Sequence, residues 1–506
     1  MTSRALVPPV GLVMCAAVVI VALVARGGGP EASSRPRAVV ARVVLDAPRR
    51  PLPAAPPGLS LEYDSLRRLV GPPGARNVAF ARLVRRLGAV SGAAPVIRIG
   101  GNSTDQSWWN PRGDPRPRTV LFDLTPAVLD DVAWLARATG ARVTLGVNLA
   151  VGEPARAVAF ARAAQRRLPP GALRALELGN EPDLYATART FRVGPLVLRR
   201  VRKRAAYGPR RYTADVQRYL AALRAGVRPT PALVIGGFAG TAWLSALPAI
   251  LDATRGEVDG VSAHLYGLRG CEDRTPPARL ADRLLEPATT DALPARLRAT
   301  VAVAAPRGLA VPVTELNTAV CGGVAGVSDR LAAALWLVDA LFAVVSAGAA
   351  QVDVHTWPGA FYAVSTEGPG RSRAPVARPA PPYAGMLLFA RAAPAGSATV
   401  PVRLVPGGAD GRARAWATVA RDGTLRVVLL NLSDGAALTV GVRPAGRGAA
   451  AGLARCGAVQ RVRAADLAAR GGIATFSGGR SCVSGGTYRV AVGRPGAALL
   501  TIARGR

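Results

Sequence analysis

Eight short apolar segments that alternate with helix-like segments constrain the fold of this chain more than any other feature. The segments are rich in Val, Leu and Ile, and they comprise residues 59–63, 95–99, 142–147, 175–178, 233–235, 260–263, 311–314 and 352–355. Segments with helical periodicity lie between them, among them residues 128–139, 155–167, 213–225 and 328–345. This alternation predicts an α/β fold, the (β/α)8 barrel. An open doubly wound sheet would need a Gly-rich phosphate turn after its first strand, and residues 59–66 contain no glycine.

The pattern changes near residue 395. Residues 400–404, 415–419, 425–430 and 438–442 read as strands separated by Gly and Asp turns, with no long helix between them. They predict an antiparallel β-sandwich over residues 395–506, after a catalytic barrel over residues 58–394. We expect residues 27–57 to be a Pro- and Arg-rich linker with one strand, residues 39–45, that joins the β-domain. The sandwich would support the barrel or bind carbohydrate, and we favour support.

The first 26 residues predict export. Arg4 precedes an apolar stretch over residues 5–25, which Arg26 and a glycine run close. Such a stretch is a signal peptide or an uncleaved signal anchor, and no clean cleavage site follows it. We therefore expect an extracellular or cell-surface monomer that meets a membrane only through this segment.

Four cysteines follow that segment. An even number in an exported chain predicts two disulfides. Pairing within each domain joins Cys271 to Cys321 and Cys456 to Cys482. We expect no metal and no cofactor, because the chain has no C-x-x-C pair and only two histidines.

The net charge of +34 raises the possibility of a nucleic-acid partner. Of the 65 basic residues, however, all but Lys203 are Arg, and they are scattered along the chain apart from a short cluster at residues 199–204. This one-sided usage indicates GC-rich coding rather than a polyanion site. We expect no nucleic-acid partner, although the charge would attract acidic polysaccharides.

Polar side chains end the predicted strands, where a β/α barrel carries its chemistry. The most informative pair is Glu181, after the fourth strand, and Glu315, at the end of the seventh. Retaining cleavage of a glycosidic bond needs a carboxylic acid to protonate the leaving oxygen and a carboxylate ~5–5.5 Å away to attack the anomeric carbon. We assign the first role to Glu181 and the second to Glu315.

Other strand ends supply groups that would serve this pair. Asn180 would hold the sugar 2-hydroxyl, and Tyr266 would hydrogen-bond the nucleophile and keep it ionised. Both histidines, His264 and His355, fall at strand ends, which favours function over a structural role. His355 has no assigned role, and neither has Trp357. The remaining candidates at strand ends are Asp64, Asn102, Asp105 and Asn148.

These motifs resemble the retaining-hydrolase clan with catalytic residues on strands four and seven, and more narrowly glycoside hydrolase family 79, the heparanase and β-glucuronidase group. The resemblance covers residues 59–394 and is carried by residues 98–105, 145–148, 177–182 and 264–266. It implies that Gly322, Gly323 and Tyr362 hold the carboxylate of a uronate, and that Asp64 binds substrate. The chain has Cys321 before its two glycines, where heparanase has a run of three glycines.

The resemblance implies a β-glucuronidase-like enzyme that hydrolyses glucuronides or acidic glycans by double displacement. Two alternatives stay open. One is a clan member acting on neutral glycosides, such as an arabinofuranosidase- or xylosidase-like enzyme, against which a carboxylate-binding loop argues. The other is an inactive, surface-anchored glycan-binding barrel, against which the two intact carboxylates argue.

Overall fold

The computed structural model describes residues 36–505 except 56, 188, 194–195, 201–205, 271–272, 370–374, 406–410, 447–451, 465 and 470–473. The predicted signal segment lies outside the described residues. Among the described residues, no helix combines the length and the apolar character needed to cross a bilayer.

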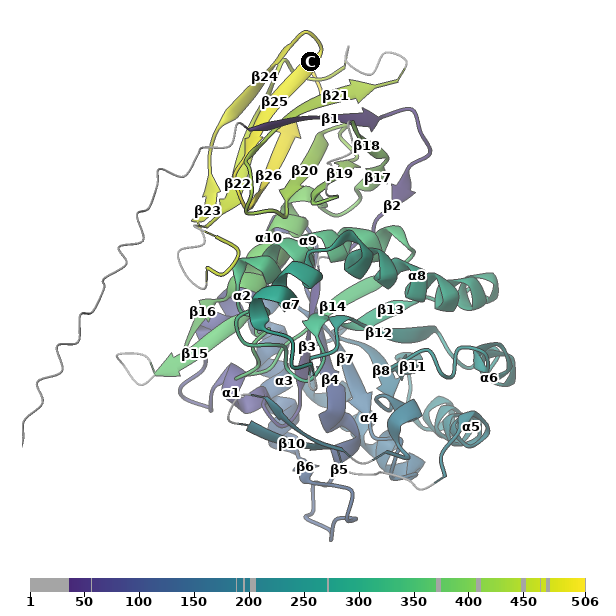
Figure 1. Cartoon of the computed structure of the whole chain (residues 1–506). Coiled ribbons are helices and arrows are strands. Elements are labelled where there is room, and N and C mark those ends of the chain that lie inside the picture. The colour runs from purple at the N-terminus through teal and green to yellow at the C-terminus, as the bar shows by residue number, and fades with distance from the viewer. Residues whose placement is uncertain are drawn as a thin grey trace, which may run out of the picture. The chain divides into compact units, whose positions relative to one another are not determined.

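Eight parallel strands close into a barrel, which confirms the predicted fold class. In chain order they are β3 (Gly58–Glu62), β4 (Val96–Gly100), β7 (Arg142–Val147), β8 (Leu173–Leu178), β11 (Ala232–Phe238), β12 (Gly260–Leu268), β13 (Pro312–Ala319) and β14 (Gln351–His355). The last strand, β14, pairs with the first, β3, and so closes the ring (Figure 1). Most of these strands are buried on both faces, because the barrel interior is packed and helices cover the outside.

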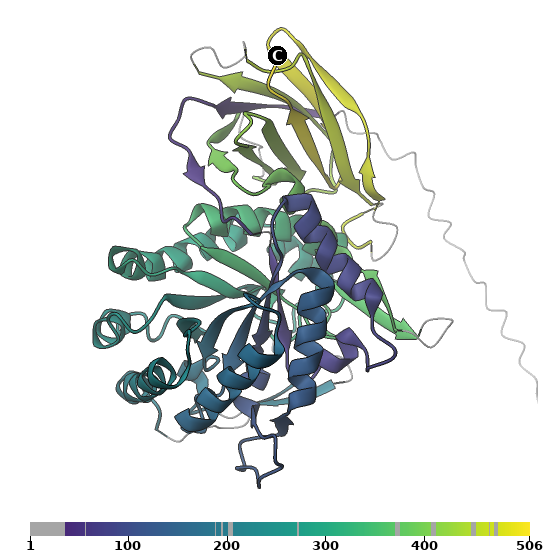
Figure 2. The same cartoon turned by 180° about the vertical axis from the view of Figure 1, so that it is seen from behind.

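Helices surround the barrel, as the view from behind also shows (Figure 2). They are α1 (Leu66–Val70), α2 (Val78–Ser91), α3 (Pro126–Thr139), α4 (Pro154–Arg167), α5 (Pro209–Gly226), α6 (Leu247–Ala253), α7 (Pro277–Leu284), α8 (Pro287–Ala304), α9 (Leu331–Ser346) and α10 (Pro381–Ala392). Many begin with proline in the first turn, where the missing N–H costs no helical hydrogen bond. Helix α3 ends at Gly140, whose φ of 68° suits a left-handed C-cap.

Short elements extend the loops of the barrel. They are the 3-10 turns η1 (Gly101–Gln106), η2 (Pro182–Leu184) and η3 (Ala305–Arg307), and the strand pairs β5 (Ser107–Trp109) with β6 (Phe122–Leu124), β9 (Arg189–Val193) with β10 (Leu196–Arg200), and β15 (Ser365–Pro369) with β16 (Pro375–Pro379). Of these, η1 follows barrel strand β4 directly and η2 begins four residues after the last residue of β8, and both lie in the segments that carry the site described below.

The C-terminal β-domain is a largely antiparallel sandwich. Its strands are β17 (Ala398–Val400), β18 (Val402–Val405), β19 (Ala413–Val419), β20 (Leu425–Asn431), β21 (Leu438–Ala445), β22 (Cys456–Arg463), β23 (Ala474–Ser477), β24 (Arg480–Ser484), β25 (Thr487–Val492) and β26 (Gly496–Ile502). Two N-terminal strands join it. Strand β1 (Arg37–Val44) lies between β18 and β21, and β2 (Arg50–Pro51) pairs with β17.

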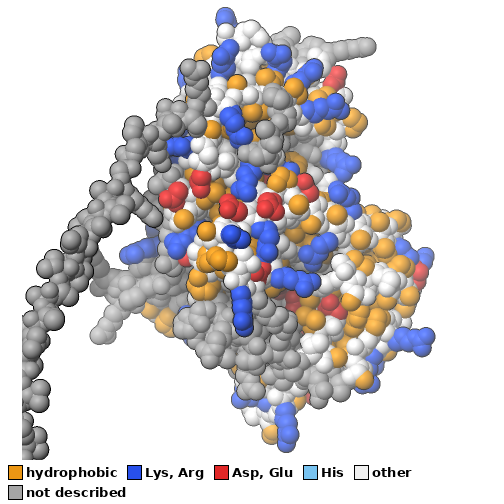
Figure 3. Space-filling model, viewed as in Figure 1, with side chains coloured by type: hydrophobic (Ala, Val, Ile, Leu, Met, Phe, Trp, Pro, Cys, Tyr) orange, Lys and Arg blue, Asp and Glu red, His pale blue; other side chains and the backbone are white. Residues whose placement is uncertain are grey.

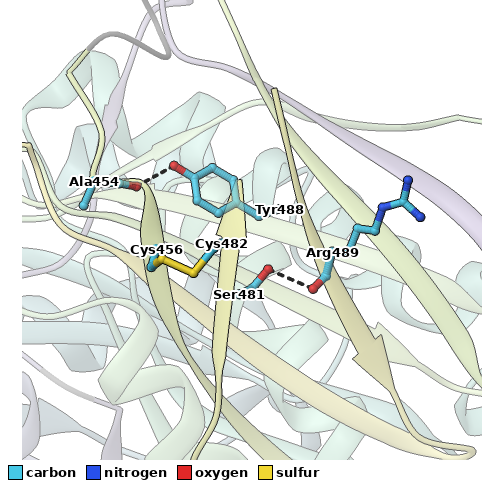
Figure 4. Close-up of a disulfide and its surroundings, with 6 residues drawn as sticks. All are labelled: Ala454, Cys456, Ser481, Cys482, Tyr488 and Arg489. Carbon is cyan, nitrogen blue, oxygen red and sulfur yellow. Dashed lines mark hydrogen bonds between the residues drawn. A yellow bond between two sulfur atoms is a disulfide. The ribbon is translucent and has the colours of Figure 1, made fainter. Parts of the chain in front are cut away.

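One predicted disulfide is present in the sandwich. Cys456 on β22 and Cys482 on β24 are directly opposite each other and are joined, which confirms that pairing (Figure 4). Close by, the Tyr488 hydroxyl donates to the Ala454 carbonyl at 2.7 Å. Cys321 is also disulfide-bonded, but Cys271 lies outside the described residues, so the second predicted pairing stays a prediction.

The sandwich packs on helix α9 of the barrel. Trp416 of β19 stacks on Phe342 of α9, with ring centroids 5.5 Å apart. The Trp416 indole N–H donates to the buried carboxylate of Asp339 at 2.7 Å, and Arg414 forms an ion pair with the same carboxylate. These contacts cover part of α9, which also packs against α8 and α10 and is buried from Leu331 to Val345. They favour the supporting role predicted for the sandwich.

Basic side chains are distributed widely over the visible surface. In Figure 3 the Lys and Arg side chains are spread over both domains and do not gather in a single patch on that face. This distribution agrees with the scattered arginines of the sequence.

Candidate active site

The two catalytic candidates lie at the C-terminal ends of the fourth and seventh barrel strands, β8 and β13, which β11 and β12 separate in the ring. Glu315 lies within β13. Glu181 directly precedes η2, and its φ of 48° is left-handed, which is uncommon for a residue other than glycine. Its backbone N–H donates to the Gly237 carbonyl at 3.0 Å, so the loop after β8 is joined to the end of β11.

The spacing of these side chains fits direct attack on a sugar. One carboxylate oxygen of Glu181, one of Glu315 and one ring nitrogen of His264 all lie within 4.8 Å of one another. Retaining glycosidases hold their two carboxyl groups ~5–5.5 Å apart, whereas inverting enzymes leave ~6.5–9.5 Å for a water molecule. The side chain of Glu181 is 12% exposed and that of Glu315 is 6% exposed, so both are largely desolvated. The geometry therefore suits a retaining mechanism.

Glu315 is surrounded by groups that favour its charged form. Its Oε1 accepts from Arg98 Nη1 at 2.9 Å, and its Oε2 accepts from the Tyr266 hydroxyl at 2.6 Å. Burial alone would raise the pKa of Glu315, but His264, His355, Arg98 and the Tyr266 bond together hold this pKa well below its usual range. Burial and the neighbouring Glu315 charge also raise the pKa of Tyr266 well above its usual value, so the phenol remains a donor. These contacts favour an ionised Glu315, the state that the predicted nucleophile needs.

Arg98 organises the floor of the site. Its wholly buried guanidinium donates to Glu177 Oε2 at 2.7 Å, to Asn180 Oδ1 at 2.9 Å and to Ser60 Oγ at 3.0 Å, besides its bond to Glu315. Burial alone would lower the pKa of Arg98. The carboxylates of Glu177 and Glu315 outweigh burial and raise this pKa above its usual value, so the arginine stays charged. It therefore fixes one nucleophile and one substrate-binding candidate at once.

Asn180 is buried and is held for the role predicted for it. Its Oδ1 accepts from Arg98, so the donor that its side chain could offer to the predicted sugar hydroxyl is the amide nitrogen. Its backbone N–H donates to Asp105 Oδ2 at 2.8 Å. Both ends of the residue are therefore fixed.

The two histidines lie on opposite sides of Glu315. His264 Nδ1 is 3.4 Å from Glu181 Oε1 and 3.7 Å from Glu315 Oε2. Burial opposes charge on His264, but the neighbouring Glu315 and Glu181 raise its pKa. His355 lies 4.0 Å from Glu315 and 3.2 Å from Ser60 Oγ, and burial lowers its pKa. The structure thus brings both histidines to the catalytic pair.

Glu62 is a third acid in the mouth, and the sequence did not single it out. Its carboxylate accepts from the backbone N–H of Asn102 at 3.1 Å and of Ser103 at 2.8 Å, and from the Ser103 hydroxyl. Burial, reinforced by the nearby Asp64 charge, raises the pKa of Glu62 to about 8. The signal available in the sequence was its place at the end of the first strand. Asn102 contributes its backbone here, and Asp64 is exposed.

Two predicted substrate contacts, Asp105 and Asn148, have hydrogen-bond partners within the protein. Asp105 is wholly buried, and it accepts from the backbone N–H of Leu149 at 2.9 Å and from the Tyr185 hydroxyl at 2.7 Å, as well as from Asn180. The side chain of Asn148 donates to the Ser107 carbonyl at 2.6 Å and accepts from the Val151 N–H at 3.0 Å. These bonds join the loops that follow β4, β7 and β8, so both residues have a positioning role, and their contact with substrate stays a prediction.

The predicted uronate-binding loop has an unusual backbone. Cys321, Gly322 and Gly323 are all left-handed, with φ of 62°, 84° and 86°. A Cβ on Gly323 would lie 3.1 Å from the Tyr362 ring, so glycine permits that contact. The Gly323 N–H donates to the Val320 carbonyl at 3.3 Å, and the Gly322 carbonyl accepts from the Phe361 N–H at 2.7 Å, so a uronate contact of this loop would fall to the Gly322 N–H.

Tyr362 and Trp357 form the wall beside this loop. The Trp357 indole N–H donates to the Tyr362 hydroxyl at 3.3 Å, and the Tyr362 ring packs edge-on against His355 with ring centroids 5.8 Å apart. Tyr362 is buried, and Trp357 and Tyr266 are partly exposed. The structure therefore places Trp357, for which no role could be predicted, beside the mouth.

A cation could in principle be held by Glu181, His264 and Glu315, the cluster of suitable spacing among the described residues. Glu315 already accepts from Arg98 and Tyr266. The Arg98 guanidinium, 2.9 Å from Glu315, repels a second positive charge there. This donor set suits proton transfer and nucleophilic attack better than metal binding.

No family model and no curated protein matches the chain. Among solved structures it is similar to a 4-O-α-L-rhamnosyl-β-D-glucuronidase from Fusarium oxysporum, with a TM-score of 0.69, 19% identity, and coverage of 92% of this chain and 100% of that one. It is also similar to a GH51 arabinofuranosidase from Xanthomonas axonopodis pv. citri, with a TM-score of 0.67, 16% identity and coverage of 92% and 99%. A bifunctional glucanase-xylanase from a metagenome library gives a TM-score of 0.63, 15% identity and coverage of 92% and 99%. At such identities the likeness shows the shared fold of barrel and sandwich.

Proposed function

We propose that this protein is a retaining glycoside hydrolase with Glu181 as acid/base and Glu315 as nucleophile. The observation that carries the proposal is the approach of their carboxylate oxygens to within 4.8 Å at the ends of the fourth and seventh barrel strands. The named activities of the three structural neighbours, all of them glycosidases, support the same class of reaction.

In the first half of the reaction, a Glu315 oxygen attacks the anomeric carbon while Glu181 gives its proton to the leaving oxygen. The bond from the anomeric carbon to that oxygen breaks, and an ester joins the sugar to Glu315. Arg98 and Tyr266 hold Glu315 as an anion before the attack. Asn180 is placed to donate to the sugar 2-hydroxyl, where hydrogen bonding strengthens in the transition state.

In the second half, Glu181 takes a proton from water, and the resulting hydroxide attacks the anomeric carbon. The ester bond breaks and Glu315 leaves as a carboxylate. The same Arg98 and Tyr266 bonds stabilise the charge that returns to Glu315. Sugar is released with its original anomeric configuration.

For the substrate we propose a β-linked glucuronic acid, as expected of a member of glycoside hydrolase family 79. The Gly322 amide and the Trp357–Tyr362 wall support this choice, since amide and hydroxyl donors bind a carboxylate well. The Fusarium neighbour, a glucuronidase, points the same way. The arabinofuranosidase neighbours support a second candidate, a neutral furanoside, which needs no carboxylate-binding group.

A panel of chromogenic glycosides tests these assignments on the full chain. We expect turnover of aryl β-D-glucuronides and little of aryl α-L-arabinofuranosides or β-D-xylosides. The reverse preference would replace the glucuronidase assignment and leave the mechanism intact. Binding of acidic glycans with no turnover of any substrate would instead favour the inactive glycan-binding alternative.

We also propose that the chain is exported and acts as a monomer outside the cytoplasm. The apolar N-terminal stretch and the disulfide of the sandwich support export, because disulfides persist in oxidising compartments. N-terminal sequencing of protein recovered from the medium and from membranes tests it. A start near residue 27 in the medium means that the segment is cleaved, whereas an intact N-terminus in the membrane fraction means that it is an anchor.

A further inference from the structure

We propose that Asp183 is a positioning residue that holds the acid/base Glu181 in place by clamping the loop after β11. This inference rests on the proposed glycosidase function and adds a residue to its machinery. Asp183 lies in η2, two residues after Glu181. Its side chain does not take part in the bonds around Glu315 described above.

The clamp is made of two hydrogen bonds to consecutive backbone amides. Asp183 Oδ1 accepts from the Ala239 N–H at 3.0 Å, and Asp183 Oδ2 accepts from the Gly240 N–H at 3.1 Å. Both amides belong to the loop that follows β11. One carboxylate therefore holds two successive residues of a neighbouring loop.

A third hydrogen bond joins the same two segments, but here the donor is on the side of Glu181 and the acceptor is near the end of β11. The Glu181 N–H donates to the Gly237 carbonyl at 3.0 Å. Three hydrogen bonds thus join residues 181–183 to residues 237–240 on both sides of the Glu181 backbone. They hold Glu181 in a left-handed conformation, which the residue would not favour by itself.

The segment that Asp183 grips is itself anchored. Phe238 and Trp243 flank the two amides, and their rings pack against each other with centroids 5.6 Å apart. Both rings also contact Tyr212, at 5.7 Å and 5.6 Å. A rigid aromatic cluster therefore fixes the loop, and Asp183 transmits that fixed position to Glu181.

The charge state of Asp183 suits this role. Burial, together with the nearby Glu181 charge, raises the pKa of Asp183 to about 6, while the two amide bonds oppose that shift. At neutral pH the side chain is a carboxylate and can accept from both amides. The proposal rests on the hydrogen bonds described above, and an ionised Asp183 is consistent with them.

A positioning role for the acid predicts a dependence on the leaving group. Good aryl leaving groups depart with little protonation, whereas poor ones depend on the acid, which contributes typically 10²–10⁴-fold. Asp183→Asn presents an NH2 group to one of the two amides and opens the clamp. We expect kcat/KM to fall about 10-fold or more for a poor leaving group, through kcat rather than KM, and by less than about 3-fold for a dinitrophenyl group.

The experiment compares the full-length wild type, Asp183→Asn and Asp183→Glu on aryl glycosides of graded leaving-group acidity. Asp130→Asn, an exposed carboxylate of α3 that pairs with Arg167, is the matched control and should keep wild-type rates. Formation of the covalent intermediate from a 2-deoxy-2-fluoro dinitrophenyl glycoside reports Glu315 alone, and it should stay within about 3-fold in Asp183→Asn. Asp183→Glu keeps the charge and should recover part of the lost rate.

The outcomes separate the two ideas. An equal loss with every leaving group, or no loss with any, overturns the Asp183 inference and leaves the glycosidase proposal standing. If Asp183→Asn does not fold, Asp183→Glu gives the same comparison, and a flat leaving-group profile in that variant overturns the inference. A wild type that hydrolyses no glycoside overturns the proposed function and this inference together.

Discussion

The interiors of the barrel and of the sandwich differ in one respect that locates the chemistry. Among the described residues, every buried charged or histidine side chain belongs to the barrel, including Arg98, Glu177, His264, Glu315 and Asp353. In residues 395–505 the buried polar side chains of the described part are Ser, Thr and Asn, and the core is formed by Val, Leu, Ile, Ala and Tyr.

This difference indicates which domain carries the proposed chemistry. Burying a charge costs several kcal/mol unless it is paired, so charges are kept inside a protein where pairing or function requires them. The sandwich interior is apolar and uncharged, as the predicted supporting role requires, and it contacts α9 through Trp416 and Phe342. The barrel contains a network of opposite charges that ends at two carboxylates in its mouth.

Among the variants considered, Glu315→Gln should lower kcat most. A small effect on kcat would contradict the contrast between the two interiors. Replacing the nucleophile removes the only group proposed to form the ester, so we expect kcat to fall on the order of 10⁴-fold or more. Steady-state kinetics on the best glycoside measures it. Glu257→Gln, at an exposed residue between α6 and β12 that is not among the site residues described above, is the control and should keep wild-type activity. Equal rates for Glu315→Gln and wild type would rule out Glu315 as nucleophile.

Arg98→Met tests whether the barrel network is also structural. The change leaves Glu177 without its 2.7 Å partner and Glu315 without its 2.9 Å partner, both inside the protein. Removing one member of a buried ion pair costs about 3–5 kcal/mol, and we expect this loss of unfolding free energy together with loss of activity.

Leu429→Ala in the sandwich core is the matched comparison for Arg98→Met. It should cost about 2–5 kcal/mol of unfolding free energy while the folded enzyme keeps its kcat. Denaturant unfolding and kinetics on both variants give the contrast. A sandwich variant that loses kcat as severely as Arg98→Met would show that the two interiors are not functionally distinct.

The elements of the fold could be predicted because each is set by local pattern. The eight predicted strand segments coincide with the barrel strands, since buried strands read as short apolar runs between turn residues. Glu181 and Glu315 could be proposed because a polar residue at a barrel strand end is visible in the sequence. The sequence therefore predicts the features that follow from the order of the strands along the chain.

The network around the site could not be reached in this way, because it depends on contacts across the barrel. Arg98 bonds Glu177 and Glu315, which are 79 and 217 residues away in sequence. Asp105 follows the second strand within η1, where a substrate-binding residue could lie, yet it is wholly buried and accepts backbone amides from other loops. The available signal was the charge of Arg98 inside an otherwise apolar strand.

Asp353→Asn tests the comparison of the two interiors through the pH dependence of stability. Burial raises the pKa of Asp353 to about 7, against about 3.9 in an unfolded chain. The folded state therefore holds a proton that the unfolded state releases, and the wild type loses stability as pH rises from about 4 through 7. Asn cannot ionise and can still accept from Gln351, so the variant should gain up to about 4 kcal/mol over wild type at pH 8 and little at pH 4.

Thermal unfolding of wild type and Asp353→Asn at several pH values measures this difference. Asp422→Asn, a surface residue of the sandwich, is the control and should not produce such a rise in relative stability above pH 7. A stability difference between Asp353→Asn and wild type that does not grow with pH would mean that Asp353 is not the buried acid responsible.

The double variant Cys456→Ser/Cys482→Ser should have the smallest effect. It should lower stability and leave kcat unchanged. The disulfide closes a loop of 26 residues, and cross-links of that size stabilise by about 3 kcal/mol, chiefly by restricting the unfolded chain. We expect a lower melting temperature, and kcat at 25 °C within about 2-fold of wild type, because neither cysteine touches the barrel network. Melting curves and kinetics on the same preparation check both halves. A loss of kcat in folded protein would mean that the sandwich shapes the active site, and the contrast between a supporting and a reacting interior would then fail.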